Sequence, residues 1–275
     1  MDRFALAAAN LLVGNDEGAA ALECTLRGPR LVALAPCAVA ITGADLDARV
    51  NQAEAPLWTS FALRAGDALT FGTRRAGVRA YVAVAGGVIA DRWLGSASTY
   101  MLVGRGGMHG RALVAGDVIA RGESYGVEPG ASLDERLRPR YGDHALAGIR
   151  GPHWSRLDTA SRAAFFAEAF TVSAHSDRMG YRLDGPRLRT EGDELLSYGL
   201  VAGVIQLPGG GQPILLMADH QTAGGYPIVA ALATASMPVA AQLAPGDALR
   251  FVETSIEDAL AARRSQRDAL LSLTS

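Results

Sequence analysis

The sequence predicts a mainly β protein of two domains with a few peripheral helices, and three observations carry this prediction. The chain has 275 residues, enough for roughly two domains at about 150 residues each. Both halves consist of short apolar runs separated by Gly and Gly-Asp turns, a spacing typical of antiparallel sheets and barrels. A polar segment punctuated by Gly and Pro, residues 121–152, lies between the halves and is typical of a linker.

The first half is predicted to begin with a helix and to continue as strands. In residues 1–14, Asp2 is placed to cap an amphipathic helix and Gly14 to end it. The expected strands are ALECTL (21–26), RLVALA (30–35), VAITG (39–43), ALTF (68–71), AYVAVAGG (80–87) and VIA (118–120).

The second half repeats the strand pattern between two helices. A short helix is expected at SRAAFFAEA (161–169), and a helix capped by Ser255 closes the chain. The expected strands are FTVSAHS (170–176), LVAGVIQLP (200–208), PILLMAD (213–219), YPIVAALA (226–233) and ALRFVE (248–253). The domains are therefore expected at residues 1–145, which include the linker, and 146–254, followed by a C-terminal helix at 255–275.

Two nine-residue segments are alike. LRAGDALTF (63–71) and LAPGDALRF (243–251) match at six of nine positions. Other similarities between the halves have a different offset, so one simple tandem copy does not account for all of them. The match indicates either intertwined, duplicated halves or a turn chemistry that β proteins reuse.

Composition excludes several classes of function. The net charge is −2 without an evident basic face, so neither nucleic acid nor a membrane is expected as a partner. All 26 basic residues are arginine; without lysine this chain forms no Schiff base, carries no covalent biotin and has no P-loop lysine. The two cysteines and five histidines lack metal-ligand spacing, so no metal is expected. The N-terminus resembles neither an export signal nor a membrane span, which predicts a cytoplasmic protein.

The first polar cluster that could carry chemistry is residues 175–182, directly after an apolar run. In a functional interpretation, Arg178 binds an anion through two hydrogen bonds, while His175 or Asp177 moves a proton. In the structural alternative, the segment is an Asp-centred turn in which an Arg bridge joins two loops.

The second cluster is residues 219–227, after the apolar run PILLMA. The pair Gly224 and Gly225 would let backbone amides approach a ligand closely, and Gln221 and Thr222 add neutral hydrogen-bonding groups. Such donors could hold a carbonyl or carboxylate oxygen. The structural alternative is a tight turn between strands.

Three well-defined functional motifs, those of a serine hydrolase, a metal site and a phosphate-binding loop, do not match the sequence. Ser176 beside His175 lacks a nucleophile-elbow motif, so serine hydrolysis is not favoured. The pairs His175/Asp177 and Asp219/His220 lack a metal-binding motif. LPGGGQP (207–213) precedes a strand rather than a helix, which indicates a hairpin turn and not a phosphate loop.

Five ordered segments resemble one known family: GSASTY (95–100), GRALVAGD (110–117), HSDRMGYRLDGP (175–186), VIQLPGGGQPILLMADHQTAGGYP (204–227) and AQLAPGDALRF (241–251). The chain is similar over nearly its whole length to the family of the 5-oxoprolinase C subunit. That family is also called allophanate hydrolase subunit 2 and biotin-dependent carboxyltransferase, and it is related to urea amidolyase.

The resemblance implies two cyclophilin-like β-barrel domains with an active-site cleft between them and obligate work with the B and A subunits of 5-oxoprolinase. In that system ATP hydrolysis drives the opening of 5-oxo-L-proline, a small cyclic amide, to L-glutamate. Family members usually begin roughly thirty residues earlier with an additional strand, so either the start of this sequence is assigned late or the first strand is absent, which would leave an unpaired sheet edge in the first domain. Ala223 stands where the family commonly has Thr.

The resemblance also implies a substrate site. Arg178 would hold the substrate carboxylate, Thr222, Gly224 and Gly225 would hold the lactam oxygen or its phosphorylated form, and Asp219 or His175 would handle protons. The complete expected set is His175, Asp177, Arg178 and Asp219 as catalytic residues and Ser176, Tyr181, Gln206, Gln221, Thr222, Gly224, Gly225 and Tyr226 as substrate contacts. ATP is expected to be bound mainly by a partner protein of the complex.

Two other functions stay open. The first is carboxyl transfer from carboxybiotin to urea or a related amide, which requires a biotinylated partner. The second is a regulatory binding protein that antagonises a kinase inhibitor resembling the B subunit. Neither is separated from the leading hypothesis by the residues alone.

Overall fold

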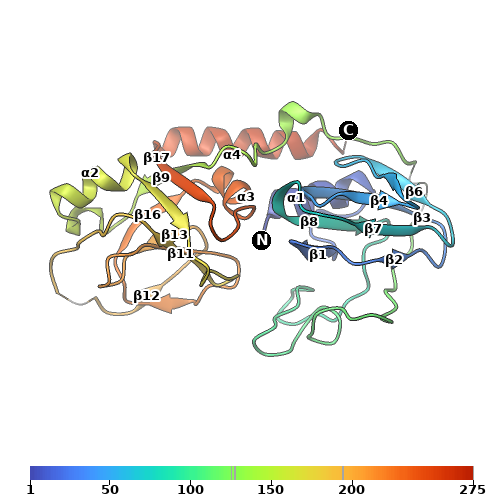
Figure 1. Cartoon of the computed structure of the whole chain (residues 1–275), viewed down its shortest axis with the longest axis horizontal. Helices are drawn as coiled ribbons and strands as arrows, with labels where there is room; N and C mark the ends of the chain where they lie inside the picture. The colour runs from blue at the N-terminus through green and yellow to red at the C-terminus, as the bar shows by residue number, and fades with distance from the viewer. Residues whose placement is uncertain (125, 127, 194, 275) are drawn as a thin grey trace. The chain divides into compact units, whose positions relative to one another are not determined.

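The computed structural model describes residues 1–124, 126, 128–193 and 195–274, and most of its regular elements are strands (Figure 1). The chain folds into two compact units. One, here called the barrel unit, comprises Met1–Asp2 and Pro139–Arg267. The other, here called the sheet unit, comprises Arg3–Arg138 and Asp268–Ser275. The mainly β fold class is therefore confirmed, while the predicted domain boundaries stay a prediction.

The barrel unit is built on a closed barrel with the strand order β10-β11-β14-β13-β16-β9-β17. Neighbouring strands are antiparallel except β9 and β17, which are parallel. The strands are β9 (Ala145–Arg150), β10 (Ala169–Val172), β11 (Gly180–Asp184), β13 (Val204–Gln206), β14 (Ile214–Leu216), β16 (Ile228–Leu232) and β17 (Ala248–Glu253). A two-stranded ribbon, β12 (Tyr198–Gly199) with β15 (Ala223–Gly224), is added to them.

A cluster of aromatic side chains fills one part of the barrel core. Its central residue, Phe165, lies on α2 (Thr159–Ala167). The Asp158 carboxylate caps this helix by accepting a hydrogen bond from the Ser161 N–H at 2.7 Å. Phe165, fully buried, stacks on Phe251 of β17 with a centroid distance of 4.8 Å and an interplanar angle of 3°. The strand β17 alternates buried and exposed side chains over most of its length, which is why Phe251 faces the core.

The sheet unit consists of two four-stranded sheets, β1-β8-β3-β6 and β2-β7-β4-β5. Their strands are β1 (Leu22–Thr25), β2 (Leu31–Val32), β3 (Cys37–Asp45), β4 (Ala48–Val50), β5 (Ala53–Glu54), β6 (Ser60–Leu63), β7 (Ala68–Phe71) and β8 (Ala76–Val84). Buried apolar side chains from both sheets form one core. The helix α1 (Arg3–Leu12) packs on β3 and β8, and its Ala5 carbonyl accepts a hydrogen bond from the Thr42 hydroxyl at 2.6 Å.

The remaining regular elements are short apart from the last helix. They are η1 (Glu135–Leu137), η2 (Trp154–Arg156), η3 (Thr234–Ser236), α3 (Met237–Ala240) and α4 (Ile256–Leu271). The predicted Ser255 cap of α4 is confirmed, because Ser255 Oγ accepts a hydrogen bond from the Asp258 N–H at 3.0 Å. The Gly-rich segment 207–213 joins the antiparallel strands β13 and β14, which confirms the predicted hairpin turn.

The observed strands differ from the predicted ones in two ways. The expected strand at 118–120 does not form; the segment contributes a hydrogen bond from Ile89 N–H to the Ala120 carbonyl at 2.8 Å and adjoins an isolated bridge. Conversely, several strands form where none was predicted, among them β4, β5, β6 and β12; the most consequential is β9, a barrel strand at residues 145–150, at the end of the polar segment 121–152. Its Ala- and Gly-containing sequence has weak β propensity, and pairing with β16 and β17 overrides that preference. The predicted linker also includes Tyr125 and Val127, which lie outside the described residues.

Three Gly-Asp turns share one geometry. In each, the Asp carboxylate accepts a hydrogen bond from the backbone N–H three residues earlier, at 2.7 Å for Asp67 and 2.8 Å for Asp117 and Asp247. The glycine before each has a φ of 93°, 95° or 92°, a region that only glycine adopts without strain. Reused turn chemistry thus accounts for the Gly-Asp pair common to the two matching nine-residue segments.

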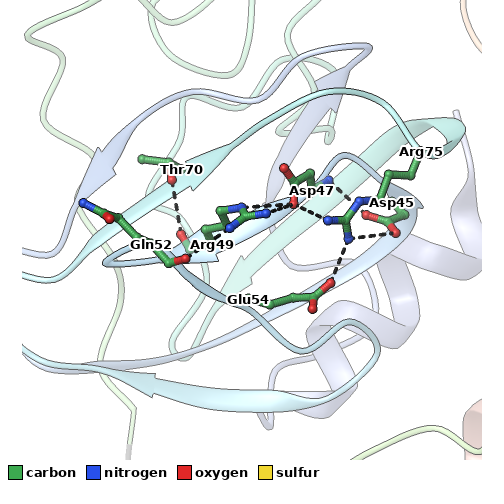
Figure 2. A network of polar contacts seen from close by, with 7 residues as sticks. All are labelled: Asp45, Asp47, Arg49, Gln52, Glu54, Thr70 and Arg75. Atoms are coloured by element: carbon green, nitrogen blue, oxygen red, sulfur yellow. Dashed lines mark hydrogen bonds and ion pairs between the residues drawn. The ribbon is translucent and has the colours of Figure 1, made fainter.

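A surface ion-pair network lies across the strands of the sheet unit (Figure 2). The Asp47 carboxylate contacts two guanidinium groups, Arg49 at 3.1 Å and Arg75 at 2.7 Å. Arg75 also contacts Glu54 on β5 at 2.7 Å. The hydrogen bond to Glu54, together with the charges of the nearby carboxylates, raises the pKa of Arg75, so its guanidinium stays charged throughout the ordinary pH range.

Gly72→Ala should destabilise the sheet unit because Gly72 faces this network. A Cβ at position 72 would lie 2.3 Å from Asp47 Oδ2, so the carboxylate would have to leave its arginine partners. The expected loss is about 1–3 kcal/mol in the free energy of unfolding, measured by urea denaturation. Gly18→Ala is the matched control, since a Cβ there meets nothing within 4 Å. Equal stability of both variants would contradict the expectation.

Candidate functional site

The segment before β11 forms a tight hairpin loop that positions most of the first predicted cluster. The Ser173 N–H donates to the Arg182 carbonyl at 2.9 Å, and the Arg182 N–H donates to Ser176 Oγ at 3.1 Å. Inside the loop, Asp177 Oδ1 accepts hydrogen bonds from the backbone N–H groups of Met179 at 2.8 Å and Gly180 at 3.2 Å. Asp177 thus centres a turn, as the structural alternative predicted.

Arg178 and Asp219, from the two predicted clusters, lie together. Arg178 Nε donates to Asp219 Oδ2 at 2.8 Å, and a terminal guanidinium nitrogen donates to Oδ1 at 3.2 Å. The Asp219 N–H also donates to the Arg178 carbonyl at 2.8 Å. The two side chains are 33% and 21% exposed, so the pair is reachable from solvent and partly shielded by protein. A bidentate bridge of this kind fixes both loops in one geometry.

A second polar group contains a buried donor without a partner. Gln206, at the end of β13, is fully buried, and its Oε1 accepts a hydrogen bond from Gln221 Nε2 at 3.1 Å. The Nε2 of Gln206 has no hydrogen-bond partner among the described residues. A Cβ at Gly224 would lie 3.2 Å from this nitrogen. Leaving a buried amide donor unpaired costs roughly 1–3 kcal/mol, which makes the position a candidate for ligand contact.

Chain packing also constrains the paired glycines. Gly224 is opposite Tyr198 in the ribbon of β12 and β15. A Cβ at Gly225 would lie 2.8 Å from the Leu195 carbonyl oxygen, so no larger residue fits without a backbone shift. Close packing of two chain segments is therefore sufficient reason for glycine at position 225, whether or not a ligand approaches.

The remaining predicted residues occupy different surroundings. His175, Thr222 and Tyr226 are exposed, and Ser176 lies in the hairpin loop. Tyr181 is only 2% exposed in the barrel core, where its hydroxyl donates to the Leu243 carbonyl at 3.4 Å. Tyr181 therefore supports the core in this structure rather than lining an open surface.

The strand β14 separates the two polar groups. Gly180, which follows the hairpin loop, is opposite Leu216, whereas Gln206 is opposite Ile214 at the other end of β14. The segment from Met217 to Gly224 connects them, since it carries both Asp219 and Gln221. The Arg178–Asp219 pair and the Gln206–Gln221 pair are thus linked by one short segment but are not in one compact cluster.

Three residues that sequence reasoning did not assign a role lie around this segment. His220 Nδ1 lies 2.7 Å from the Gln221 carbonyl, which only accepts, so Nδ1 carries a proton and Nε2 of the neutral ring is an acceptor. His153 and Tyr198 have ring centroids 5.4 Å apart, and the Tyr198 hydroxyl donates to the Tyr226 carbonyl. No motif signals His153, because it comes from a turn far from the other residues in the sequence.

His153 is expected to stay neutral at physiological pH. Its Nδ1 accepts a hydrogen bond from the Ile228 N–H at 3.0 Å, so the proton of the neutral ring is on Nε2. Burial, followed by the charge of Arg156, lowers the pKa of His153 below its ordinary value. Burial also raises the pKa of Tyr198, the aromatic neighbour.

A pH titration tests this expectation. The pKa of His153, followed through its ring proton signals by NMR, should lie below about 6.5, the value in an unfolded chain. Because the folded-state pKa is lowered, protonation favours the unfolded chain, so this residue's contribution to stability falls as pH drops below about 6.5. A measured pKa at or above that value would contradict the assigned environment.

Two further features, a group of metal-ligating side chains and a membrane-spanning helix, are absent from the described residues. In the part of the chain that the structure describes, no three His, Cys, Asp or Glu side chains gather as metal ligands would. None of the described helices combines the length and apolar character needed to cross a membrane.

The fold and these contacts define a class: a mainly β chain of two units whose barrel unit presents a hydrogen-bonded Arg–Asp pair and a buried amide donor. A family model described as "Carboxyltransferase domain, subdomain A and B" matches residues 1–253. The chain belongs to this family. The predicted resemblance is therefore confirmed.

Curated relatives fall into two groups. The 5-oxoprolinase C subunit of Escherichia coli (strain K12) is 42% identical over 270 residues, covering 97% of this chain and 86% of the relative. That of Haemophilus influenzae is 31% identical, covering 96% and 84%. The urea amidolyase of Saccharomyces cerevisiae is 31% identical over 293 residues; it covers 99% of this chain, which spans only 16% of that protein.

Solved structures of urea carboxylase and urea amidolyase have a fold similar to that of this chain. The urea carboxylase of Kluyveromyces lactis superposes with a TM-score of 0.93 at 28% identity, and the K. lactis urea amidolyase with 0.91 at 28%. Both comparisons cover 99% of this chain, which spans 26% and 18% of those chains.

Proposed function

We propose that this chain is the C subunit of an ATP-dependent 5-oxoprolinase and acts with homologues of the A and B subunits to convert 5-oxo-L-proline to L-glutamate. Two relatives that bear the name of the 5-oxoprolinase C subunit, each aligned over more than four-fifths of its length, support this proposal. In the reaction, water is added across the ring amide, the C–N bond breaks, and ATP is hydrolysed to ADP and phosphate.

The observation that carries the proposal is the unpaired Nε2 of Gln206. An amide N–H that is buried and unpaired requires an acceptor, and the carbonyl oxygen of a small cyclic amide is one. Because Gln206 has no exposed surface, the oxygen would reach this N–H only when the neighbouring segment from Gln221 to Gly224 moves aside. The hydrogen bond from Gln221 Nε2 to Gln206 Oε1 fixes the orientation of the Gln206 amide, so that its N–H groups keep one direction. Thr222, Gly224 and Gly225 closely follow Gln221 and would complete the surroundings of the oxygen.

The Arg178–Asp219 pair would serve the charged end of the substrate. A guanidinium group that is already bonded to Asp219 by two nitrogens is held in a fixed orientation, which favours a positioning role toward a substrate carboxylate. Asp219 or His175 would handle protons, and His220, with Nε2 as an acceptor, is a further candidate.

ATP is proposed to bind mainly on a partner protein of the complex. Asp219 compensates the charge of Arg178, so this group brings no uncompensated cation to a triphosphate. We therefore assign no phosphate-transfer step to this chain. Nor does it carry biotin covalently, because it contains no lysine.

A second candidate function is carboxyl transfer to urea or a related amide. The family description and the urea amidolyase and urea carboxylase relatives favour it. This function requires a biotinylated partner. Absence of any biotinylated protein among partners captured with this chain would count against carboxyl transfer.

Reconstitution tests the proposal. The chain is combined with homologues of the A and B subunits, and ATP-dependent formation of L-glutamate from 5-oxo-L-proline is measured. Turnover should require all three proteins and ATP. A complex that assembles but releases no glutamate would contradict the proposal, and carboxylation of urea by a biotinylated complex would establish the second candidate instead.

A further inference from the structure

The sheet unit contains a cavity that the proposed function does not use. Its volume is about 430 Å³, within the range of about 300–1,000 Å³ typical of small-molecule sites. Apolar side chains from both sheets line it, among them Leu22, Val39, Leu63, Leu69, Val82 and Val84. An apolar interior of this size between two sheets suits a hydrocarbon chain rather than a polar metabolite.

Two arginines give this cavity a positive charge. Arg121 donates hydrogen bonds to neutral acceptors, including the Ser124 hydroxyl at 3.0 Å and the Pro36 carbonyl at 3.3 Å, and no described carboxylate pairs with it. Arg30 also lines the cavity, is exposed, and has neither a hydrogen bond nor an ion pair among the described residues.

The acidic residue of the lining does not cancel this charge. Asp117 is held by Arg111 through two hydrogen bonds of 2.8 Å each. Its charge is therefore already compensated outside the lining set, and Arg30 and Arg121 keep an uncompensated positive charge beside an apolar interior.

We propose that this cavity binds an aliphatic monocarboxylate, with the hydrocarbon chain between the two sheets and the carboxylate on the Arg30 guanidinium. The apolar lining excludes a ligand that is polar throughout, because its buried groups would lose their hydrogen bonds to water. The unpaired guanidinium selects a negatively charged head over a neutral one, since it matches the planar geometry of a carboxylate.

Cys37 offers a built-in reporter because it lines the cavity and is half-buried. The only other cysteine, Cys24, is buried in the core, and burial raises its pKa to about 12, so it should resist alkylation. Burial also raises the pKa of Cys37, an effect that the charge of Arg121 opposes. At mildly alkaline pH, iodoacetamide should therefore modify Cys37 selectively.

The experiment uses the full chain with sodium decanoate as the probe, kept below its micelle-forming concentration. Binding is measured by isothermal titration calorimetry, and the rate of Cys37 alkylation by mass spectrometry. At ten times the dissociation constant, decanoate should slow alkylation by about tenfold. Decanol, with the same tail and no charge, and acetate, with the same head and no tail, should bind more weakly.

Variants identify the head-group contact. Arg30→Gln should weaken decanoate binding by about tenfold, as expected for one charge-assisted hydrogen bond. Arg27→Gln, an exposed arginine of the same segment outside the lining, is the matched control and should leave binding unchanged. Because the exposed Arg30 side chain makes neither a hydrogen bond nor an ion pair with the described residues, its replacement should leave the unfolding midpoint nearly unchanged. Failure of decanoate to bind or to protect Cys37, or equal binding of decanol with no effect of Arg30→Gln, would overturn the proposal.

Discussion

Arg178→Ala is expected to reduce the turnover of 5-oxo-L-proline by the reconstituted complex by about 10²–10³-fold, the range for loss of a preorganised charged or hydrogen-bonding group at a reaction centre. The substitution removes the guanidinium and leaves Asp219, only 21% exposed, without its two hydrogen bonds. Steady-state measurement of kcat and KM with the purified proteins checks this.

The two interpretations of Arg178 predict different measurements. If Arg178 positions the substrate carboxylate, the KM for 5-oxo-L-proline should rise, and Arg178→Lys should restore little, because an ammonium lacks the two-bond geometry. If Arg178 is only a bridge between loops, the free energy of unfolding should fall while KM stays unchanged. Arg140→Ala, an exposed arginine of the barrel unit, is the control. A wild-type kcat/KM for Arg178→Ala would refute the substrate role.

The parts of the fold that the sequence could predict are those in which a local signal acts alone. Ser255 caps α4 through the Asp258 N–H, and Gly-Asp pairs form turns because the carboxylate accepts a nearby backbone N–H. Both are interactions over three residues and are visible as spacing. The strand β9 depends instead on pairing with β16 and β17, which are distant in sequence. Its own residues have weak β propensity and do not predict a strand.

The candidate site, too, has features that the sequence indicated and features that only the three-dimensional fold reveals. The polar residues at strand ends marked the segments of Arg178 and Asp219 separately, and only the family resemblance placed both in one site. The two side chains lie together because β11 and β14 are neighbours in the barrel. The sequence did not reveal that Tyr181 faces the core, since the neighbouring polar residues obscure the strand alternation. His153 went unassigned because only the fold brings it to Tyr198. The roles of the residues in the reaction stay predictions.

Phe165→Ala should cause the largest loss of stability in the barrel unit. Phe165 is fully buried, stacks on Phe251 at 4.8 Å, and also contacts Trp154, Phe166 and Phe170 at centroid distances of 5.6, 4.9 and 6.1 Å. Truncation to Ala removes apolar contacts and leaves a cavity that rigid strands close only in part, at a cost of about 3–5 kcal/mol. Against a total of about 5–15 kcal/mol for a typical domain, this loss is large.

Urea denaturation measures the loss in the free energy of unfolding caused by Phe165→Ala. Hydrogen exchange of peptides from β9, β10 and β17 shows whether these barrel strands become less protected. Phe166→Ala is the matched control: the same side chain is lost one residue further along α2, but Phe166 is only partly buried. Since the cavity term depends on how fully the lost side chain was enclosed, the control should lose clearly less stability and exchange less in these strands. Equal losses in the two variants would mean that the helix contact as a whole, rather than the enclosed ring of Phe165, stabilises the barrel.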